Sequence, residues 1–468
     1  MLSRSRLCSN VVCLLLLSST LSAAEPAWRA ATAKAKITPA DKIWMAGYAS
    51  RNKPSEGVAL DLYAKTLVVQ DAAGTRLAIV TLDLIGVPRS LREQVEQVIA
   101  KEYGLPPSAL LMNASHTHCG PELRVRRAED DVSSGGDSEQ GSRVAQALEY
   151  SANLQKTIVA MIGDCLGRLE PAKLSYSHAR CGFAMNRRLP TATGFNNSPY
   201  PDGPVDHAVP VLRIEAETGE LRGILFGYAC HNTTLSFYQF CGDYAGYAQE
   251  YLEAAHPGTV AMFVLGCGGD QNPYPRGVIE QCRQHGRSLA NAVETALLPA
   301  PTPVNGPLSS AIQTAALEFA PLPERSVLET KTQSKNQYEA SHARRILAQL
   351  NQPGGVNMEY PYYVQVIRFG EALTMIALAG EVVVDYSLRL KREHSGETLW
   401  VAGYSNDVFG YVPSLRVLKE GGYEGGGAML YTSLPGPFAE SVEERIMDKV
   451  NELLSQTKSG SLSGEEKK

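Results

Sequence analysis

Two histidines stand two residues apart where an apolar run ends, in the segment Ser115-His-Thr-His-Cys-Gly-Pro121. Residues 109–112 predict a short buried strand, so both imidazoles fall at the point where a strand gives way to a loop. If the backbone stays extended through Thr117, the side chains of His116 and His118 point to one side, because strand side chains alternate. The pair can then face one metal ion or one substrate, although ordinary packed or surface histidines share this spacing.

Polar side chains also follow three other apolar runs. His231 ends one of them, Asp270 lies in a glycine-rich loop after another, and Glu381 follows residues 373–378. A glutamate directly after an apolar strand is costly to bury unless it is paired, which favours a catalytic or ligand-binding role over simple packing. Imidazoles together with one carboxylate form the ligand set of a catalytic zinc ion, at which an open position activates water.

Charge and motifs disfavour several other functions. The chain carries 44 Lys and Arg against 49 Asp and Glu, a formal net charge of -5, so nucleic acid is not an expected partner. The glycine-rich residues 266–273 are not followed by the Lys-Ser/Thr pair of a P-loop. A metallo-β-lactamase-like site is disfavoured because Gly120 and Pro121, and not Asp and His, follow the histidine pair. A non-enzymatic binding protein stays open as an alternative.

The predicted fold class is α/β, with mixed sheets flanked by helices. Residues 77–85 are typical of a strand buried on both faces, and the following helix is predicted to begin with a capping box of Ser90 and Glu93 and to stop at Gly104. With the strand before His116 these elements make a βαβ unit, whose ligands collect beyond the carboxyl ends of the strands. Further strands are predicted at residues 173–177, 209–214, 221–230, 259–265, 360–368, 373–378 and 398–403, and further helices at 144–166, 243–255, 278–297, 334–350, 383–393 and 438–454.

One domain is predicted at residues 25–455, between a signal peptide at residues 1–24 and a disordered polar tail at residues 456–468. Two arginines, an apolar core and small residues before the cleavage site mark a secretory signal, so we expect a secreted or periplasmic protein. No segment approaches the roughly 18 apolar residues of a membrane helix, so no transmembrane segment is expected. Residues 125–142 are expected to form a mobile loop and residues 299–307 a linker-like connection.

The cysteines do not form an obvious scaffold. Of nine cysteines, Cys8 and Cys13 leave with the signal, and the remaining seven include at least one free thiol because their number is odd. Cys119 and Cys230 each stand next to a histidine. For both, buried packing is favoured over thiolate ligation of a metal.

The order of the motifs resembles the catalytic domain of the neutral ceramidases, zinc amidases that cleave the N-acyl bond of ceramide. The matching segments run from about residue 37 to residue 431 in the order of the family, which covers most of the chain. They include Ser115-His-Thr-His-Cys-Gly-Pro121, Ala184-Met-Asn-Arg187, Tyr228-Ala-Cys-His231, Gly269-Asp270, Gly380-Glu381, Ala402-Gly-Tyr-Ser-Asn406, Tyr411-Val412 and Tyr423-Glu-Gly425.

The resemblance implies a zinc site and a set of residues around the scissile bond. The zinc ligands that it implies are His116, His231, Glu381 and Tyr411. The residues that it implies to face the scissile amide are His118, Arg187 and Tyr423. Zinc lowers the pKa of bound water, and cationic or hydroxyl donors then stabilise the oxyanion.

The chain departs from the family's pattern at three points. Asn272 stands in Gly269-Asp-Gln-Asn-Pro273 where the family has a catalytically essential serine. An amide is neither a nucleophile nor a general base, but it can donate a hydrogen bond to an oxyanion, with Asp270 as a candidate proton acceptor. Cys119 replaces a second serine, and we expect no room after the matching segments for the family's immunoglobulin-like C-terminal domain.

The predicted function is therefore an exported zinc-dependent hydrolase that cleaves an amide (N-acyl) bond through a zinc-activated water. The expected partner is a small-molecule or lipid-like substrate, and the sequence does not predict an oligomeric state. An ester, a lactone or a glycan-linked group stays open as the bond that is cleaved, because a zinc-activated water is not selective by itself. A catalytically inactive ligand-binding homologue is the alternative from another class.

Overall fold

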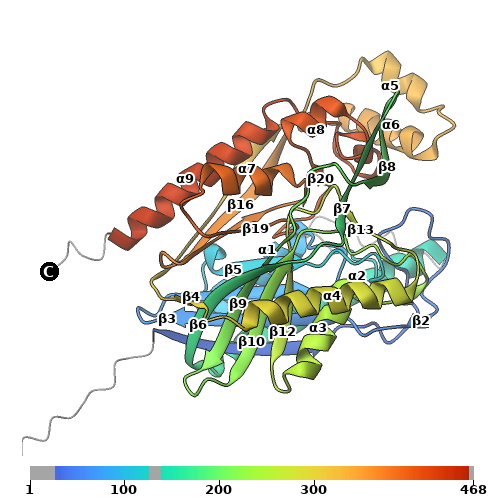
Figure 1. Ribbon diagram of the computed structural model, residues 1–468. Helices are drawn as coiled ribbons and strands as arrows, with labels where there is room; N and C mark the ends of the chain where they lie inside the picture. Colours follow the sequence, from blue (N-terminus) through green and yellow to red (C-terminus); the bar gives the residue numbers. More distant parts are fainter. Residues whose placement is uncertain (1–26, 126–138, 463–468) are drawn as a thin grey trace, which may run out of the picture.

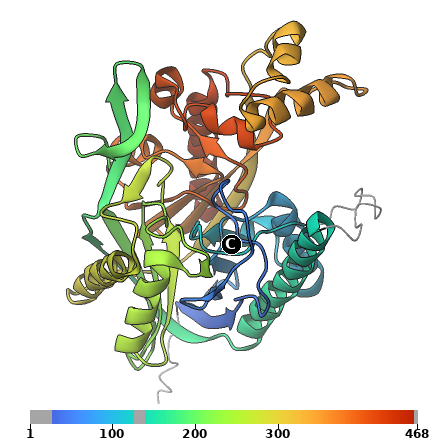
Figure 2. The same ribbon diagram turned by 90° about the vertical axis from the view of Figure 1, so that its right-hand side faces the viewer.

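Two sheets lie face to face between two sets of helices in the computed structural model, which describes residues 27–125 and 139–462 (Figure 1, Figure 2). This arrangement confirms the predicted α/β class with mixed sheets flanked by helices. The signal peptide predicted at residues 1–24 and most of the loop predicted at residues 125–142 lie outside the described residues. No helix within the described ranges combines the length and the apolar character needed to cross a bilayer.

The large mixed sheet has the strand order β12-β10-β9-β6-β1-β3-β4-β5, and β14 pairs with β6. The parallel pairs are β4 with β5 and β10 with β12, and the other pairs are antiparallel. Its strands are β1 (Trp28–Lys36), β3 (Tyr63–Asp71), β4 (Arg76–Leu82), β5 (Leu110–Ala114), β6 (Glu170–Arg180), β9 (Ala208–Ala216), β10 (Leu221–Tyr228), β12 (Val260–Leu265) and β14 (Thr302–Val304).

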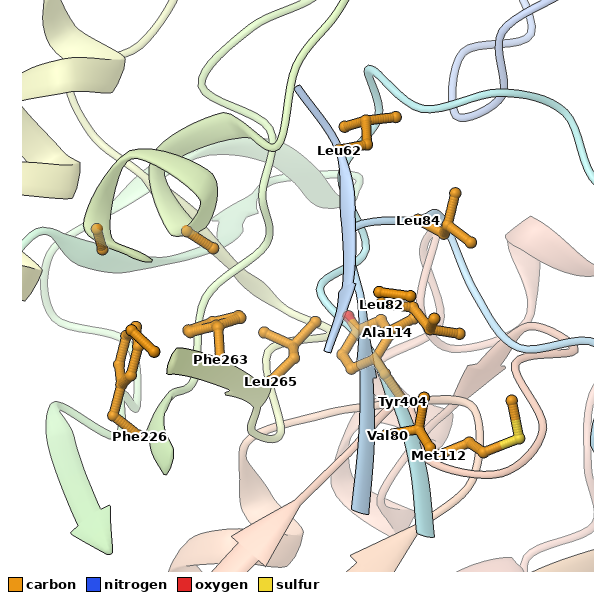
Figure 3. Close-up of a cluster of buried hydrophobic side chains, with 14 of the residues drawn as sticks. Leu62, Val80, Leu82, Leu84, Met112, Ala114, Phe226, Phe263, Leu265 and Tyr404 are labelled. Atoms are coloured by element: carbon orange, nitrogen blue, oxygen red, sulfur yellow. The ribbon is translucent and has the colours of Figure 1, made fainter. Parts of the chain in front are cut away.

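Both faces of the large sheet are buried. Side chains of one face, such as Val68 and Val80, pack against helices α1 (Arg89–Tyr103), α2 (Glu139–Gly167), α3 (Asp243–Ala255) and α4 (Ile279–Leu297). The alternate residues, such as Leu67 and Ile79, pack against the second sheet. Figure 3 shows part of the first layer: side chains from β4 and β5 and Leu265 of β12 lie close to Tyr404, and Phe226 of β10 lies farther along the layer. Burial on both faces explains why these strands are continuous apolar runs.

The second sheet has the order β15-β16-β17-β19 and is covered on its outer face by α7 and α9 (Figure 1). Its elements are β15 (Leu308–Glu318), β16 (Glu359–Phe369), β17 (Leu373–Leu378), β19 (Leu399–Ala402), α7 (Asp385–Glu393) and α9 (Val442–Leu462). The α5–α6 pair extends away from this body (Figure 2). The remaining elements are β2 (Gly57–Val58), η1 (Pro107–Ala109), β7 (Ala184–Thr191), β8 (Gly194–Tyr200), β11 (Gln239–Phe240), β13 (Gln271–Pro273), α5 (Arg325–Lys331), α6 (Gln337–Leu350), β18 (Glu381–Val382), β20 (Tyr411–Val412), α8 (Leu415–Glu420) and η3 (Gly427–Tyr431).

The predicted βαβ unit is confirmed, because β4 and β5 are parallel and α1 connects them. The predicted end of helix α1 at Gly104 is also confirmed, since Gly104 has a left-handed φ of 65°, which glycine adopts without strain. The predicted capping box is wrong. The N-cap of α1 is Pro88, without a side-chain hydrogen bond, and Ser90 therefore lies inside the helix.

Two predicted irregular segments contain regular structure. The linker predicted at residues 299–307 contains β14, which pairs with β6. The tail was expected to be disordered from residue 456, but α9 continues to Leu462. Leu453, Leu454 and Thr457 are buried against the second sheet or its neighbours, which explains why this polar segment stays helical.

Candidate metal centre and active site

The two histidines of the opening motif lie directly after β5, at the carboxyl end of a parallel strand pair. The expectation of an extended backbone through Thr117 is wrong, because β5 ends at Ala114 and His116 has a left-handed φ of 61°. The imidazoles nevertheless meet, with 3.1 Å between the Nε2 atoms of His116 and His118. A local turn, and not strand alternation, brings them to one side.

Backbone carbonyls fix the tautomers of the two innermost imidazoles. The Nδ1 atom of His116 lies 2.5 Å from the carbonyl oxygen of Ile85, and that of His231 lies 2.6 Å from the carbonyl oxygen of Gly268. A carbonyl oxygen can only accept, so each Nδ1 carries the proton and donates it. Each Nε2 therefore keeps a lone pair, and both lone pairs are available at the centre of the site.

Glu381 and Tyr411 reach the same centre from the two-stranded sheet of β18 and β20. Strands β18 and β20 pair in parallel with Glu381 opposite Tyr411, which sets the two side chains next to each other. The Oε2 atom of Glu381 lies 3.1 Å from Nε2 of His116 and 3.2 Å from Nε2 of His231. The hydroxyl of Tyr411 lies 3.2 Å from Nε2 of His231.

The backbone before Glu381 depends on glycine. Gly380 has a φ of 72°, and a Cβ atom there would lie 2.7 Å from a side-chain atom of Val412. A larger residue would separate the two short strands that carry Glu381 and Tyr411.

These donors fit a divalent metal ion. Within the described residues, Oε2 of Glu381 is buried and receives no hydrogen bond, although two imidazole lone pairs face it. A shared cation would offset the repulsion between these donors. Bonds of 2.0–2.1 Å in a tetrahedron give donor separations of about 3.3 Å, close to the observed 3.1–3.2 Å.

His118 has a different place in the cluster. Its donor atom lies, like those of His116 and His231, within 4.8 Å of the others, so the three imidazoles alone also form a possible metal site. Glu381, however, approaches both His116 and His231, which favours Glu381 over His118 as the third ligand. The Nδ1 atom of His118 is buried and has no partner in the described structure, and burial holds the pKa of His118 well below its usual range.

Arg187 and Asn272 lie beside the candidate ligands. The guanidinium of Arg187 donates from Nη2 to the hydroxyl of Tyr411 (3.0 Å) and from Nη1 to Oδ1 of Asn272 (3.3 Å). That same Oδ1 accepts from Thr233, while Nδ2 of Asn272 donates to Asn197. Burial alone lowers the pKa of Arg187, but Tyr411 and Glu424 raise it well above its ordinary value, so the guanidinium is charged.

Asp270 lies next to this group with a different set of partners. Its Oδ1 accepts from the backbone N–H of Val384 (2.8 Å) and its Oδ2 accepts from Nδ2 of Asn186 (3.0 Å). Burial raises the pKa of Asp270 to about 6, although the Val384 hydrogen bond opposes that shift. The carboxylate therefore joins the glycine-rich loop to the chain segment directly after Glu381.

A pocket of about 340 Å³ leads to His116, Glu381 and Tyr411. Tyr423 stands at its rim, with 40% of its surface exposed and its ring centroid 5.2 Å from that of Tyr411. Most of the remaining wall is apolar and includes Ile85, Leu123, Val408, Phe409, Ala428 and Met429. A substrate that carries an apolar group next to a polar bond matches such a wall.

Three residues of the site escaped the sequence analysis. Tyr404 packs its ring 4.7 Å from that of His116, Tyr48 packs 4.7 Å from His118, and Glu424 accepts hydrogen bonds from Arg187. Tyr404 and Glu424 both lie inside segments that match the family's motifs, which is the one signal that points to them. Tyr48 lies far from these motifs, in a loop without regular structure.

The seven cysteines of the described chain are free and buried. Cys119 and Cys230 both belong to the main hydrophobic core, and burial raises the pKa of each thiol well above its usual range. The packing interpretation is confirmed for both.

Comparisons with known proteins identify the family of this chain. The model of the family described as neutral/alkaline non-lysosomal ceramidase, N-terminal, matches residues 29–315, more than half of the chain. The neutral ceramidase of Pseudomonas aeruginosa is 28% identical over 272 residues, which are 56% of this chain and 39% of that protein. The chain thus matches about two fifths of the length of this curated relative.

The fold is also similar to solved structures. A crystal structure of neutral ceramidase from Pseudomonas aeruginosa matches 90% of this chain and 72% of its own, with a TM-score of 0.67 and 21% identity. A ceramidase complexed with C2 gives a TM-score of 0.65 at 20% identity, over 90% of this chain and 73% of its own. At 90% of this chain, these matches extend beyond residue 315, where the match to the family model ends. The chain therefore belongs to the neutral/alkaline non-lysosomal ceramidase family.

Proposed function

We propose that this protein is an exported zinc-dependent hydrolase that cleaves an amide (N-acyl) bond. The convergence of four donor atoms, Nε2 of His116, Nε2 of His231, Oε2 of Glu381 and the hydroxyl of Tyr411, at the inner end of an apolar pocket carries the proposal. These four residues would hold the zinc ion. When bound, zinc supplies a Lewis acid that polarises a carbonyl and lowers the pKa of a nearby water.

The chain's own residues divide the remaining tasks. His118 faces the centre beside His116, and its Nδ1 atom has no hydrogen-bond partner within the described residues, which suits a group that accepts and returns a proton. Arg187 keeps its charge next to Tyr411 and orients the carboxamide of Asn272. Tyr423, at the rim of the pocket, is the residue that contacts the substrate as it enters.

Asn272 and Asp270 favour direct attack of water over a covalent intermediate. A carboxamide is not a nucleophile, and the Oδ1 atom of Asn272 already accepts from Arg187 and Thr233. Both oxygens of Asp270 accept hydrogen bonds from Val384 and Asn186, which favours a role in positioning the loops around the site. The apolar wall supports an acyl chain as the substrate's apolar part.

A hydrolysis screen of purified, zinc-loaded protein tests the proposal. The panel contains fatty N-acyl amides including ceramide, esters, lactones and acylated sugars, and Glu381→Gln is the matched inactive control. We expect fatty-acid release from N-acyl amides that Glu381→Gln abolishes. Turnover confined to esters, lactones or sugars contradicts amide cleavage, and bound zinc without any turnover supports a binding homologue. N-terminal sequencing of protein recovered outside the cytoplasm tests export and the cleavage of the predicted signal peptide after residue 24.

A further inference from the structure

One buried carboxylate accepts hydrogen bonds from two consecutive arginines. The Oε1 atom of Glu424 accepts from Nε of Arg187 (2.8 Å), and its Oε2 accepts from Nη1 of Arg188 (2.7 Å). Consecutive side chains of a regular strand point to opposite faces. The pairing of β7 with β8 shifts register between Asn186 and Arg188, and such a bulge re-aims a side chain. The irregular strand thus lets both arginines reach Glu424.

The three charged groups are almost completely removed from water. The exposed fractions are 4% for Arg187, 3% for Arg188 and 3% for Glu424. Charges at this depth must be paired and hydrogen-bonded, and removal of one partner leaves the others uncompensated. Arg188 has a second carboxylate, Glu420, at 3.1 Å. Within the described chain, Glu424 supplies the ion pair of Arg187.

The hydrogen bond from Nε decides where the rest of the Arg187 guanidinium points. The group is planar, so a donor held at Nε fixes the directions of both Nη atoms. These atoms donate to Tyr411 and Asn272, which are the candidate ligand and the residue in the place of the family's serine. Glu424 also follows Tyr423 directly in the chain, so its ion pairs fasten the rim of the pocket to β7.

We propose that Glu424 is a positioning residue of this site, which aims Arg187 at Tyr411 and Asn272 and holds the segment that carries Tyr423. This inference rests on the proposed function, because it assigns the carboxylate to the same metal centre. The side chain of Glu424 forms its hydrogen bonds and ion pairs with Arg187 and Arg188, and within the described residues none joins it to the four candidate ligands. It acts through Arg187, and its loss changes the site without removing a ligand.

The test compares Glu424→Gln with Glu420→Gln in the full-length protein. A glutamine at residue 424 presents an amide N–H₂ to one of two arginine donors, so Arg187 loses its fixed plane. We expect Glu424→Gln to lower the affinity for Zn²⁺, measured by competition with a chelator, and kcat by about 10- to 100-fold each, as is usual for residues that orient metal ligands. Glu420→Gln weakens the partly exposed pairs with Arg188 and Arg416 and leaves the contact of Glu424 with Arg187 in place, so both quantities should stay within twofold of wild type.

A double variant separates positioning from simple stability. Glu424→Leu with Arg188→Met removes one positive and one negative charge but also leaves Nε of Arg187 without its acceptor, so the melting temperature should recover in part while the Zn²⁺ affinity and kcat stay low. Equal Zn²⁺ affinity in Glu424→Gln and wild type overturns the inference, and so does a double variant in which Zn²⁺ affinity and kcat recover together with stability. A wild-type protein without turnover contradicts the proposed function, whereas the comparison of Zn²⁺ affinities still decides the inference.

Discussion

The carboxylate of Glu381 lies 3.1 Å from the imidazole of His116, although one residue follows a strand of the second sheet and the other a strand of the large sheet. The Oε2 atom of Glu381 is buried, and the Nε2 lone pairs of His116 and His231 both face it. The site thus forms where the loops after β5 and β10 of the large sheet meet the two-stranded sheet of β18 and β20, because each side supplies part of the donor set. Removal of a donor from either side should have the same effect on metal binding.

Glu381→Gln and His116→Ala should each lose zinc. Glutamine keeps the shape of Glu381 but not its charge, and alanine removes a lone pair whose direction the Ile85 carbonyl fixes. We expect zinc per chain, measured by elemental analysis after dialysis, to fall well below that of wild type in both variants. Glu122→Gln is the control, since Glu122 lines the same pocket but pairs with Arg124 and Arg143. Full zinc content in either test variant contradicts the assignment of the ligands.

Asn272→Ser should lower kcat although it restores the residue of the family. Serine cannot span the distance to both Arg187 and Thr233, so Arg187 loses an acceptor that is worth about 1.5 kcal/mol, or about tenfold in rate. Asn197→Ser is the matched control, because it breaks only the contact with Nδ2 of Asn272. An unchanged kcat on every active substrate means that residue 272 does not tune the reaction.

Many of the strands and helices could be predicted because their buried residues form recognisable apolar patterns in the sequence. Strand β4 and the strand before His116 are apolar runs buried on both faces, and Gly104 stops α1 in a conformation that other residues rarely adopt. Strands β1, β3, β7, β8 and β15 are not among the predicted strands. After Trp28 and Arg29, the sequence of β1 consists of alanines, lysines and a threonine with a weak apolar pattern, and its pairing with β3 and β6 makes it a strand.

The site was less predictable than the fold. Residues far apart in the sequence meet for two reasons. Strands β18 and β20 pair, and the bridges of Asn113 with Ser405 and of Gly266 with Ala402 join the ends of the large sheet and the second sheet. No local sequence pattern predicts either contact. Tyr411 and Arg187 came from the resemblance alone. No sequence pattern singles out Glu424. Its hydrogen bonds to both arginines depend on the register shift in β7, and no residue type in that strand predicts the shift.

The metal-free protein should lose stability in acid through His231. Burial, and then the charge of Arg187, lower the pKa of His231 to about 4, whereas an unfolded histidine titrates near 6.5. Above pH 6.5 the imidazole is neutral in both states. As the pH falls from 6.5 to about 4, His231 binds a proton in the unfolded chain but stays neutral in the folded protein. This difference lowers the free energy of unfolding by about 3 kcal/mol.

Urea unfolding at a series of pH values, in the presence of a chelator, measures this loss. The free energy of unfolding should fall across that window in wild type and fall less steeply in His231→Gln, which has no imidazole at this position. Equal slopes for the two proteins would mean that His231 is not responsible for the acid sensitivity.

Tyr48 should support His118 through its ring more than through its hydroxyl. The ring lies 4.7 Å from that of His118, and the hydroxyl donates to the carbonyl of Leu235 at 2.9 Å. Tyr48→Phe removes the hydrogen bond and should cost about 1 kcal/mol of unfolding free energy with little change in kcat. Tyr48→Leu also removes the ring contact, so the imidazole of His118 is no longer held in one orientation. We expect kcat to fall about tenfold while zinc is retained. Kinetics and elemental analysis of the two variants decide this, since an equal kcat in both would show that the ring does not position His118.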